Sequence, residues 1–272
     1  MFTQNPFASA AQSLPAGFLQ WFLVVMALAV VAGVIFDVIH KGSARYFFEN
    51  MRRSKSKGRQ VGGGEKISIA VQTLAVDVLA SGEFCNAKRR VAHLLGMYGF
   101  ILYLVATAML VFAYLGTAEA GIWPALWWIG ALMIVVGGYW FWFFIRVDVA
   151  AEGHSPFRLV KADLFILSLL ASTTLGILWA LAGGGTGILF WLYLFATAVL
   201  FFGVPWSKFA HMFFKPAAAF EKRLSRADGT AENLPLQTRD DPEQQKRHSM
   251  ELLKDAPMDM GLGIKREAPR HY

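Results

Sequence analysis

Long apolar runs alternate with short polar segments along most of the chain. Five runs each contain about 20 residues or more, the length at which an α-helix spans the hydrocarbon core of a bilayer. They extend from Gly17 to Ile39, Val91 to Leu115, Ile122 to Ile145, Ala162 to Ala182 and Ile188 to Phe209. Backbone polar groups in hydrocarbon must bond within their own segment, as they do in a helix. The pattern therefore predicts an all-α integral membrane protein, a bundle of five transmembrane helices.

Lys and Arg residues are distributed unevenly among the segments that connect these runs. Segment 41–90 contains eleven of them and the 146–161 connection adds three, whereas residues 1–16, the 116–121 loop and the 183–187 turn contain none. Short cytoplasmic loops of membrane proteins carry an excess of Lys and Arg. The distribution predicts that the N-terminus lies outside, that the C-terminus is cytoplasmic, and that the large polar segments face the cytoplasm.

The amino-acid composition excludes several classes of function for this chain. Charged residues make up 17% of the chain, against about 25% in a typical soluble domain. The net charge of +7 comes mostly from the loop asymmetry, so nucleic-acid binding is a poor explanation for it. With Cys85 as the single cysteine, an intrachain disulfide, a cysteine-ligated iron–sulfur cluster and a Cys-rich zinc site are excluded. If the chain carries a redox cofactor, we expect a haem.

The runs divide the chain into a membrane domain and a tail. We expect a five-helix membrane domain over residues 1–220, with a cytoplasmic loop at 41–90. Residues 221–272 are polar and rich in both charges, with little apolar periodicity, so a disordered cytoplasmic tail is expected there.

The loop contains a second helical pattern. Residues 52–64 are basic and glycine-rich, which favours a segment that faces anionic lipid. Residues 65–82 then place apolar side chains on one helical stripe, formed by Ile67, Val71, Leu74, Val78 and Leu79. This stripe predicts an amphipathic helix that lies on the membrane surface or against a partner, or alternatively packs on its own bundle.

Two histidines stand at the ends of apolar runs. His93 begins the second run, in NAKRRVAHLLGMYGF, and His211 closes the fifth, in VPWSKFAHMFFKP. The topology brings both to the cytoplasmic surface, so both imidazoles can bind one haem iron as axial ligands. A ligating side chain at membrane depth is costly and is a functional hypothesis by default. The alternative is a pair of interfacial histidines that reach the headgroups.

Other polar residues near this surface are candidates for supporting roles. His40, at the end of the first run, is a reserve ligand. Lys208 and Arg90 are candidates to bind a haem propionate or a quinone headgroup, and Asp37 is a third candidate for the quinone. For Lys208 the alternative is a lipid anchor, because basic residues gather at the cytoplasmic ends of spans. Gly99 removes side-chain bulk, which suits either a macrocycle or close helix packing.

The two histidine segments resemble a known family, the nitrate reductase gamma-subunit superfamily of membrane cytochromes b. KRRVAHLLGMYGF, residues 88–100, is similar to the start of its second span, and PWSKFAHMFFKP, residues 205–216, to the end of its fifth. The resemblance covers residues 15–220. It implies a haem b held between the second and fifth spans, with the ligand positions on His93 and His211.

The chain departs from the family at the positions of a second ligand pair. These positions hold Tyr103 and Tyr193, and the second and fifth runs contain no other histidine. The resemblance therefore implies one haem b near the cytoplasmic face and no outer haem. Without the outer haem, no cofactor of this chain carries electrons across the whole membrane. We therefore expect quinone to react near the inner face.

Within this superfamily the chain most resembles the membrane anchors associated with adenylylsulfate reductase in sulfur oxidisers. That likeness implies a bacterial cytoplasmic membrane and an electron-transfer subunit of a quinone-linked respiratory complex. Its partners are then a cytoplasmic enzyme with flavin and iron–sulfur cofactors, and the quinone pool. The rival interpretation is a haemless membrane anchor that recruits a soluble redox complex through the same basic face.

Overall fold

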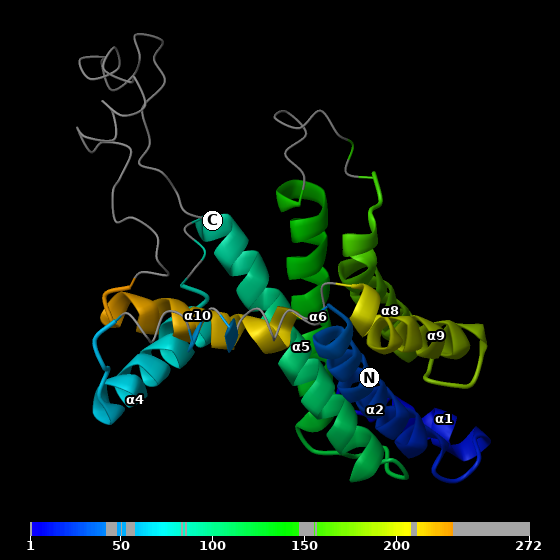
Figure 1. Ribbon diagram of the computed structural model, residues 1–272. Helices are drawn as coiled ribbons and strands as arrows, with labels where there is room; N and C mark the ends of the chain where they lie inside the picture. Colours follow the sequence, from blue (N-terminus) through cyan, green and yellow to red (C-terminus); the bar gives the residue numbers. More distant parts are fainter. Residues whose placement is uncertain are drawn as a thin grey trace. The chain divides into compact units, whose positions relative to one another are not determined.

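The computed structural model describes residues 2–41, 48–49, 51–52, 58–82, 84, 86–146, 155, 157–207 and 211–230. In these residues the regular structure is helical apart from one isolated bridge between Gln4 and Glu119, which confirms the all-α prediction (Figure 1). The chain divides into two units. Unit 1 comprises residues 1–45 and 80–215, and unit 2 comprises residues 46–79 and 216–272.

Within the described part, four helices of unit 1 are long and apolar enough to cross a membrane. They coincide with the first four predicted runs, so the chain has the elements of a multi-pass membrane protein. They are α2 (Phe18–Lys41), α5 (Ala87–Phe112), α6 (Trp123–Trp140) continued by the π-helical turn η2 (Phe141–Ile145), and α8 (Leu164–Leu181) preceded by the one-turn η3 (Lys161–Asp163).

The fifth apolar run is interrupted, contrary to the prediction of one helix up to Phe209. Helix α9 (Ile188–Phe202) has 15 residues, about 22 Å of helix against a hydrocarbon core of about 30 Å. It ends at Gly203 and is followed by the one-turn η4 (Val204–Trp206), and the chain resumes as α10 (His211–Ala227). Pro205 follows this end of the helix, and proline cannot continue an α-helix because it has no N–H to donate.

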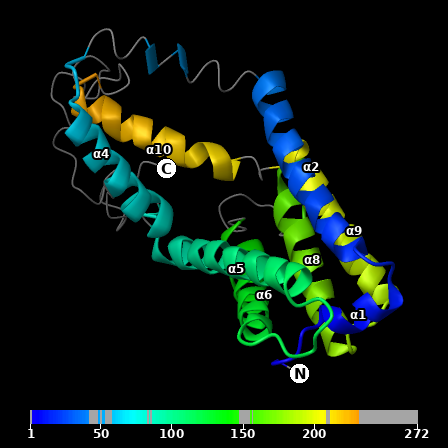
Figure 2. The ribbon, with the colours of Figure 1, turned by 90° about the horizontal axis from the view of Figure 1, so that it is seen from below.

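The helices of unit 1 pack in pairs around an aromatic core. Helix α5 packs most extensively against α6, and α8 against α9, as both ribbon views show (Figures 1 and 2). Helix α2 packs on α9 and η4, where a side chain at Gly33 would collide with Val204. The short α1 (Phe7–Ser13) places Phe7 against Trp179. The turn between α8 and α9 uses two glycines with positive φ, Gly183 and Gly184, as the glycine-rich sequence predicts.

Glycines set the contact between α5 and α6. A Cβ at Gly130 would lie 2.6 Å from the backbone nitrogen of Tyr103, and a Cβ at Gly99 would lie 2.9 Å from the carbonyl oxygen of Gly130. The two backbones therefore touch directly, as they do where small residues line helix interfaces in membranes. Of the two interpretations of Gly99, helix packing is the one that the structure supports. Gly96 differs, because a Cβ there meets nothing within 4 Å.

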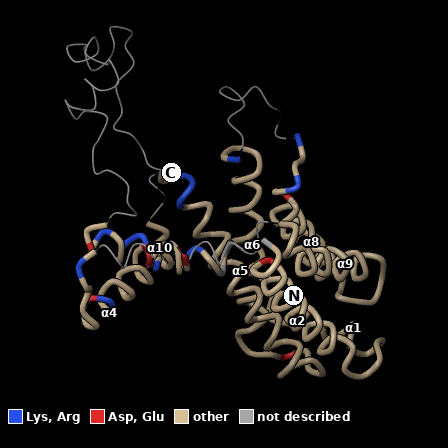
Figure 3. The backbone as a smooth tube through the Cα atoms, viewed as in Figure 1, with Lys and Arg blue, Asp and Glu red and all other residues tan. Residues whose placement is uncertain are grey.

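The charged residues of α5 lie in its first turn, and α6, α8 and α9 contain none (Figure 3). The basic residues gather at one end of unit 1, and the opposite end carries Glu119 as its charged residue among those described. The basic end is formed by Lys88, Arg89, Arg90, Arg146, Arg158 and Lys161.

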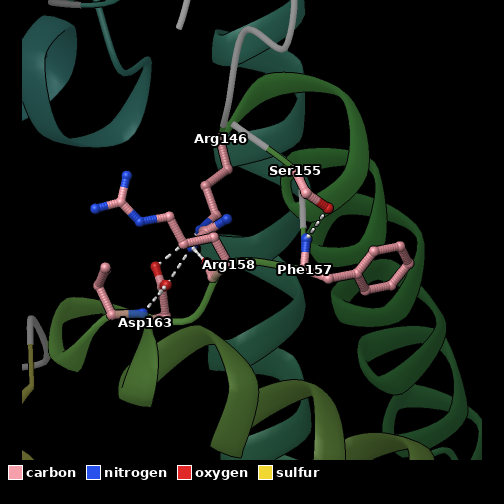
Figure 4. A network of polar contacts seen from close by, with 6 residues as sticks. Arg146, Ser155, Phe157, Arg158 and Asp163 are labelled. Carbon is pink, nitrogen blue, oxygen red and sulfur yellow. Dashed lines mark hydrogen bonds and ion pairs between the residues drawn. The ribbon is translucent and has the colours of Figure 1, made fainter. Parts of the chain in front are cut away.

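An ion pair joins the end of η2 to the start of α8. Arg146 donates from Nε to Asp163 at 2.8 Å and pairs with its second oxygen through Nη2, which also donates to the carbonyl of Arg158 (Figure 4). Both charged side chains are about 10% exposed. Asp163 additionally accepts from the backbone N–H of Val160.

Unit 2 contains the amphipathic helix and most of α10. Helix α4 (Gly63–Gln72) continues as the π-helical η1 (Thr73–Leu79), which confirms a helix over this pattern. Three stripe residues, Ile67, Val71 and Leu74, are more than half exposed. Asp77 accepts two hydrogen bonds from Arg223, at 2.5 and 3.0 Å, and these raise the pKa of the guanidinium.

Helix α10 passes from unit 1 into unit 2 and contains Pro216. It continues to Ala227, so the first residues of the predicted polar tail are helical. Residues 231–272, the larger part of that tail, lie outside the described residues.

The glycine contact predicts the effect of adding one methyl group. Gly130→Ala should destabilise unit 1 by about 1–3 kcal/mol, because the new Cβ meets backbone that cannot yield without separating the helices. Gly96→Ala is the matched control on α5 and should leave stability unchanged or slightly raised. Thermal unfolding in detergent measures both. An equal loss of stability in the two variants would contradict the packing argument.

The ion pair predicts a second stability difference. Asp163→Asn leaves Arg146 nearly buried without its counter-charge, which should destabilise the protein by about 3 kcal/mol. The exposed pair of Arg59 and Glu65 is the control, and Glu65→Gln should cause no measurable change because solvent screens that pair. Chemical denaturation of the detergent-solubilised protein compares the two. If Asp163→Asn were as stable as the wild type, the ion pair would not be what holds the end of η2 to the start of α8.

Candidate functional site

A turn held by hydrogen bonds precedes α5 at the basic end of unit 1. The side chain of Asn86 caps the helix by accepting from the N–H groups of Lys88 and Arg89. Arg90 donates from Nε to the carbonyl of Ala80 at 2.8 Å, which ties the first turn of α5 back to the preceding segment. Arg90, a predicted propionate or quinone candidate, therefore has a structural contact here.

His93 lies one turn further along α5 and contacts this turn. Its Nδ1 is 3.0 Å from the Ser81 hydroxyl, and its ring lies 4.8 Å from that of Phe84. Ser81 is 1% exposed and has a φ of +48°, in the left-handed region that few non-glycine residues adopt. Such strain persists where surrounding structure imposes it, and it clusters at functional sites.

The hydrogen bond from Ser81 orients the His93 ring as the ring of a metal-binding histidine is oriented. A histidine that binds a metal nearly always has its other ring nitrogen held by a second group, which fixes the orientation of the ring. Ser81 is such a group for Nδ1 of His93. Gly96, one turn after His93, leaves open space beside the helix. The surroundings of His93 therefore fit an axial haem ligand.

The second predicted ligand is only partly placed. His211 is the first residue of α10, instead of the last turn of a continuous fifth helix, because the chain is interrupted after Phe202. Its side chain, together with Lys208, lies outside the described residues. The pairing of His93 with His211 thus stays a prediction.

The two candidates on α2 have different environments. His40 is exposed and stacks on Phe36, with ring centroids 5.1 Å apart. Asp37 is 4% exposed, although it lies in an apolar helix. Among the described contacts, no group is hydrogen-bonded to the His40 ring in the way that Ser81 is to His93.

A buried hydrogen bond joins Tyr103 and Tyr193, the residues at the positions of the second ligand pair. Their hydroxyl oxygens are 3.0 Å apart, and Tyr103 donates to Tyr193. Axial ligands stand on opposite faces of a macrocycle and cannot touch each other. The direct bond therefore leaves no space for a haem between these two side chains.

Aromatic rings enclose the tyrosine pair. Trp127 lies 5.1 Å from the Tyr103 ring, and Trp179 stacks on Tyr193 at 5.5 Å with an interplanar angle of 17°. Gly176 on α8 makes room for the pair, because a Cβ there would lie 2.9 Å from the Tyr103 hydroxyl. The rings are thus held on four helices, α5, α6, α8 and α9.

Beside the pair is a cavity of about 40 Å³ between α2, α5, α8 and α9. Its wall is almost entirely apolar. The polar exceptions are the hydroxyl-bearing side chains Tyr103, Thr107, Ser172, Thr173, Tyr193 and Thr197.

The family resemblance predicts the tyrosines only as replacements of histidines, and no role was predicted for Thr107 and Thr197. A signal was present, because YLVAT at 103–107 and YLFAT at 193–197 differ at one position. In each copy the threonine donates to the carbonyl oxygen of the tyrosine one turn earlier, at 2.7 and 2.8 Å. Each copy of the pentapeptide thus begins with one of the two hydrogen-bonded tyrosines.

No family model, no curated protein and no solved structure matches this chain. The function is therefore inferred from the residues themselves and from the resemblance to the membrane cytochromes b.

Proposed function

We propose that the protein is a membrane-bound b-type haem subunit that transfers electrons between a cytoplasmic redox enzyme and the quinone pool. The observation that carries the proposal is the environment of His93, whose Nδ1 is held by a buried and conformationally strained Ser81. His93 and His211 are the proposed axial ligands, with His40 in reserve. When bound, the haem supplies one-electron redox chemistry.

The charge distribution supports the proposed topology. The described basic residues of unit 1 gather at one end of the helices (Figure 3), as expected of a cytoplasmic face. In this topology α9 is the fifth span, the N-terminus is outside and the C-terminus is cytoplasmic. The membrane is the bacterial cytoplasmic membrane, as the family resemblance implies.

The tyrosine pair supports a single haem. Because Tyr103 and Tyr193 bond directly, the outer ligand position is closed to a second macrocycle. Electrons then enter and leave the haem from the cytoplasmic side, and none crosses the whole bilayer. The basic end, including Lys88 and Arg89, is the proposed docking face for an enzyme with flavin and iron–sulfur cofactors, with adenylylsulfate reductase as the specific candidate.

The proposal predicts a haem spectrum that depends on two histidines. The full chain, purified in detergent from haem-replete cells, should give a reduced-minus-oxidised spectrum of a b-type cytochrome. His93→Ala and His211→Ala should each abolish or strongly weaken the Soret band, because an axial ligand is lost. His40→Ala tests the reserve ligand and should leave the spectrum unchanged when His93 and His211 hold the iron.

A preparation without haem would overturn the proposal. If a soluble redox enzyme still co-purified with such a preparation, and with both histidine variants, the protein would instead be a haemless anchor. Loss of the spectrum in His40→Ala with retention in His93→Ala would move the ligand to α2.

Ser81 is proposed as a positioning residue for His93. Ser81→Ala removes the hydroxyl that holds Nδ1 and should lower haem affinity about tenfold, as second groups behind metal ligands typically do. Ser81→Gly removes the same hydroxyl but accepts the positive φ without strain. Haem titration of the two variants compares them. Wild-type affinity in Ser81→Gly would show that the hydroxyl has no role.

A further inference from the structure

Helix α4 and its continuation η1 carry an apolar stripe that is largely exposed. Four residues of the stripe are between 46% and 67% exposed, namely Ile67, Val71, Leu74 and Leu79. Val78, the fifth, is partly buried. Side chains three or four positions apart lie on the same side of a helix, so the stripe forms a continuous apolar surface. A contiguous apolar surface left exposed marks an interaction site.

Residues outside the stripe give the same helix its polar character. Ser68 and Gln72, each of which follows a stripe residue in sequence, are exposed. Thr73 is 3% exposed and donates to a carbonyl of its own helix. Asp77 accepts from Arg223 of α10, within unit 2. The helix is therefore amphipathic, and its ion pair with α10 is made by a residue outside the stripe.

The exposed charge of unit 2 is positive. Among the residues that the structure describes in this unit, the exposed charged ones are all basic (Figure 3): Arg52, Arg59, Lys66, Lys222 and Arg226. The described acidic residues of the unit are partly or fully buried. Interfacial helices combine an apolar face with Lys and Arg, which attract anionic lipid headgroups. The stripe and the exposed charge together are complementary to an anionic bilayer.

The chain connects this helix directly to a candidate membrane span. Leu79 ends η1 and Ala87 begins α5, so residues 80–86 are the whole connection. Because α5 is long and apolar enough to cross a membrane, a helix tethered to it meets lipid at high effective concentration. A soluble partner would leave the stripe in water until it arrived, whereas the bilayer is always present.

We propose that the apolar stripe of α4 and η1 inserts into the surface of an anionic bilayer, with the exposed basic residues of unit 2 toward the phospholipid headgroups. The bilayer is the one that unit 1 spans. The helix lies along the surface, because a crossing helix would place Glu65, Lys66 and Asp77 in hydrocarbon. Of the environments predicted for the stripe, the lipid surface is thus the one chosen, and a protein partner is an outcome of the test.

Spin labels on the full chain, reconstituted in vesicles of phosphatidylglycerol and phosphatidylcholine, test this placement. The labels are attached in Val71→Cys and Gln72→Cys, each combined with Cys85→Ser to remove the native cysteine. Gln72 is the matched control, because it is adjacent and also exposed but lies outside the stripe. The label at position 71 should collide severalfold more with oxygen, which dissolves in lipid, than with a water-soluble nickel chelate. The label at position 72 should show the reverse.

Lipid charge provides a second comparison that needs no substitution. Amide hydrogen exchange of residues 65–79 in the unaltered chain should be severalfold slower in the anionic vesicles than in phosphatidylcholine alone. High salt should reduce this difference, because it screens the attraction between the basic residues and the headgroups.

Three results would overturn the proposal. Equal access of the nickel chelate to both labels in anionic vesicles would show that the stripe is in water. Protection of the label at position 71 from both reagents would show that protein covers the stripe, either a second copy or another part of this chain. Exchange that is equal in the two lipids would remove the role of the basic residues.

Insertion of the stripe goes beyond the proposed function and is independent of the haem. A haem-free preparation whose stripe enters the bilayer would sustain the lipid contact while the proposed function fails. A b-type spectrum from a protein whose stripe stays in water would do the reverse.

Discussion

Hydroxyl groups buried among apolar helices must find their partners inside the protein, and the organisation of unit 1 depends on this constraint. Thr107 and Thr197 bond to the backbone of their own helices, whereas Ser172 bonds across from α8 to α9. The bond between Tyr103 and Tyr193 joins α5 to α9. Because an unpaired buried hydroxyl is costly, these bonds specify how the helices are aligned along their length.

Helix α5 connects the two candidate sites. It carries His93 in its second turn and Tyr103 ten residues later, a separation of about 15 Å along the helix axis. Between them Gly99 holds α5 directly against α6. The turn at Ser81 and the Asn86 cap orient the beginning of the helix. The positions of the proposed haem ligand and of the tyrosine pair are thus set by one rigid element.

The predictions succeeded where they depended on local pattern. Apolar runs and the Ile67–Leu79 stripe became helices because side-chain periodicity and backbone hydrogen bonding act within a segment. The fifth run was misjudged because hydropathy does not register the loss of a donor at Pro205. The partner of Arg146 could not be read from the sequence, since Asp163 is distant in sequence and comes close only when α6 and α8 are placed.

The sequence by itself determined the class of the molecule: long apolar helices, a basic face, and histidines at the ends of two apolar runs. It also identified Tyr103 and Tyr193 as departures from a ligand pattern. Tertiary structure decided what those residues do instead, because a hydrogen bond between side chains ninety positions apart forms only once their helices have packed. The same holds for Ser81 and His93, whose contact depends on a turn with an unusual backbone conformation.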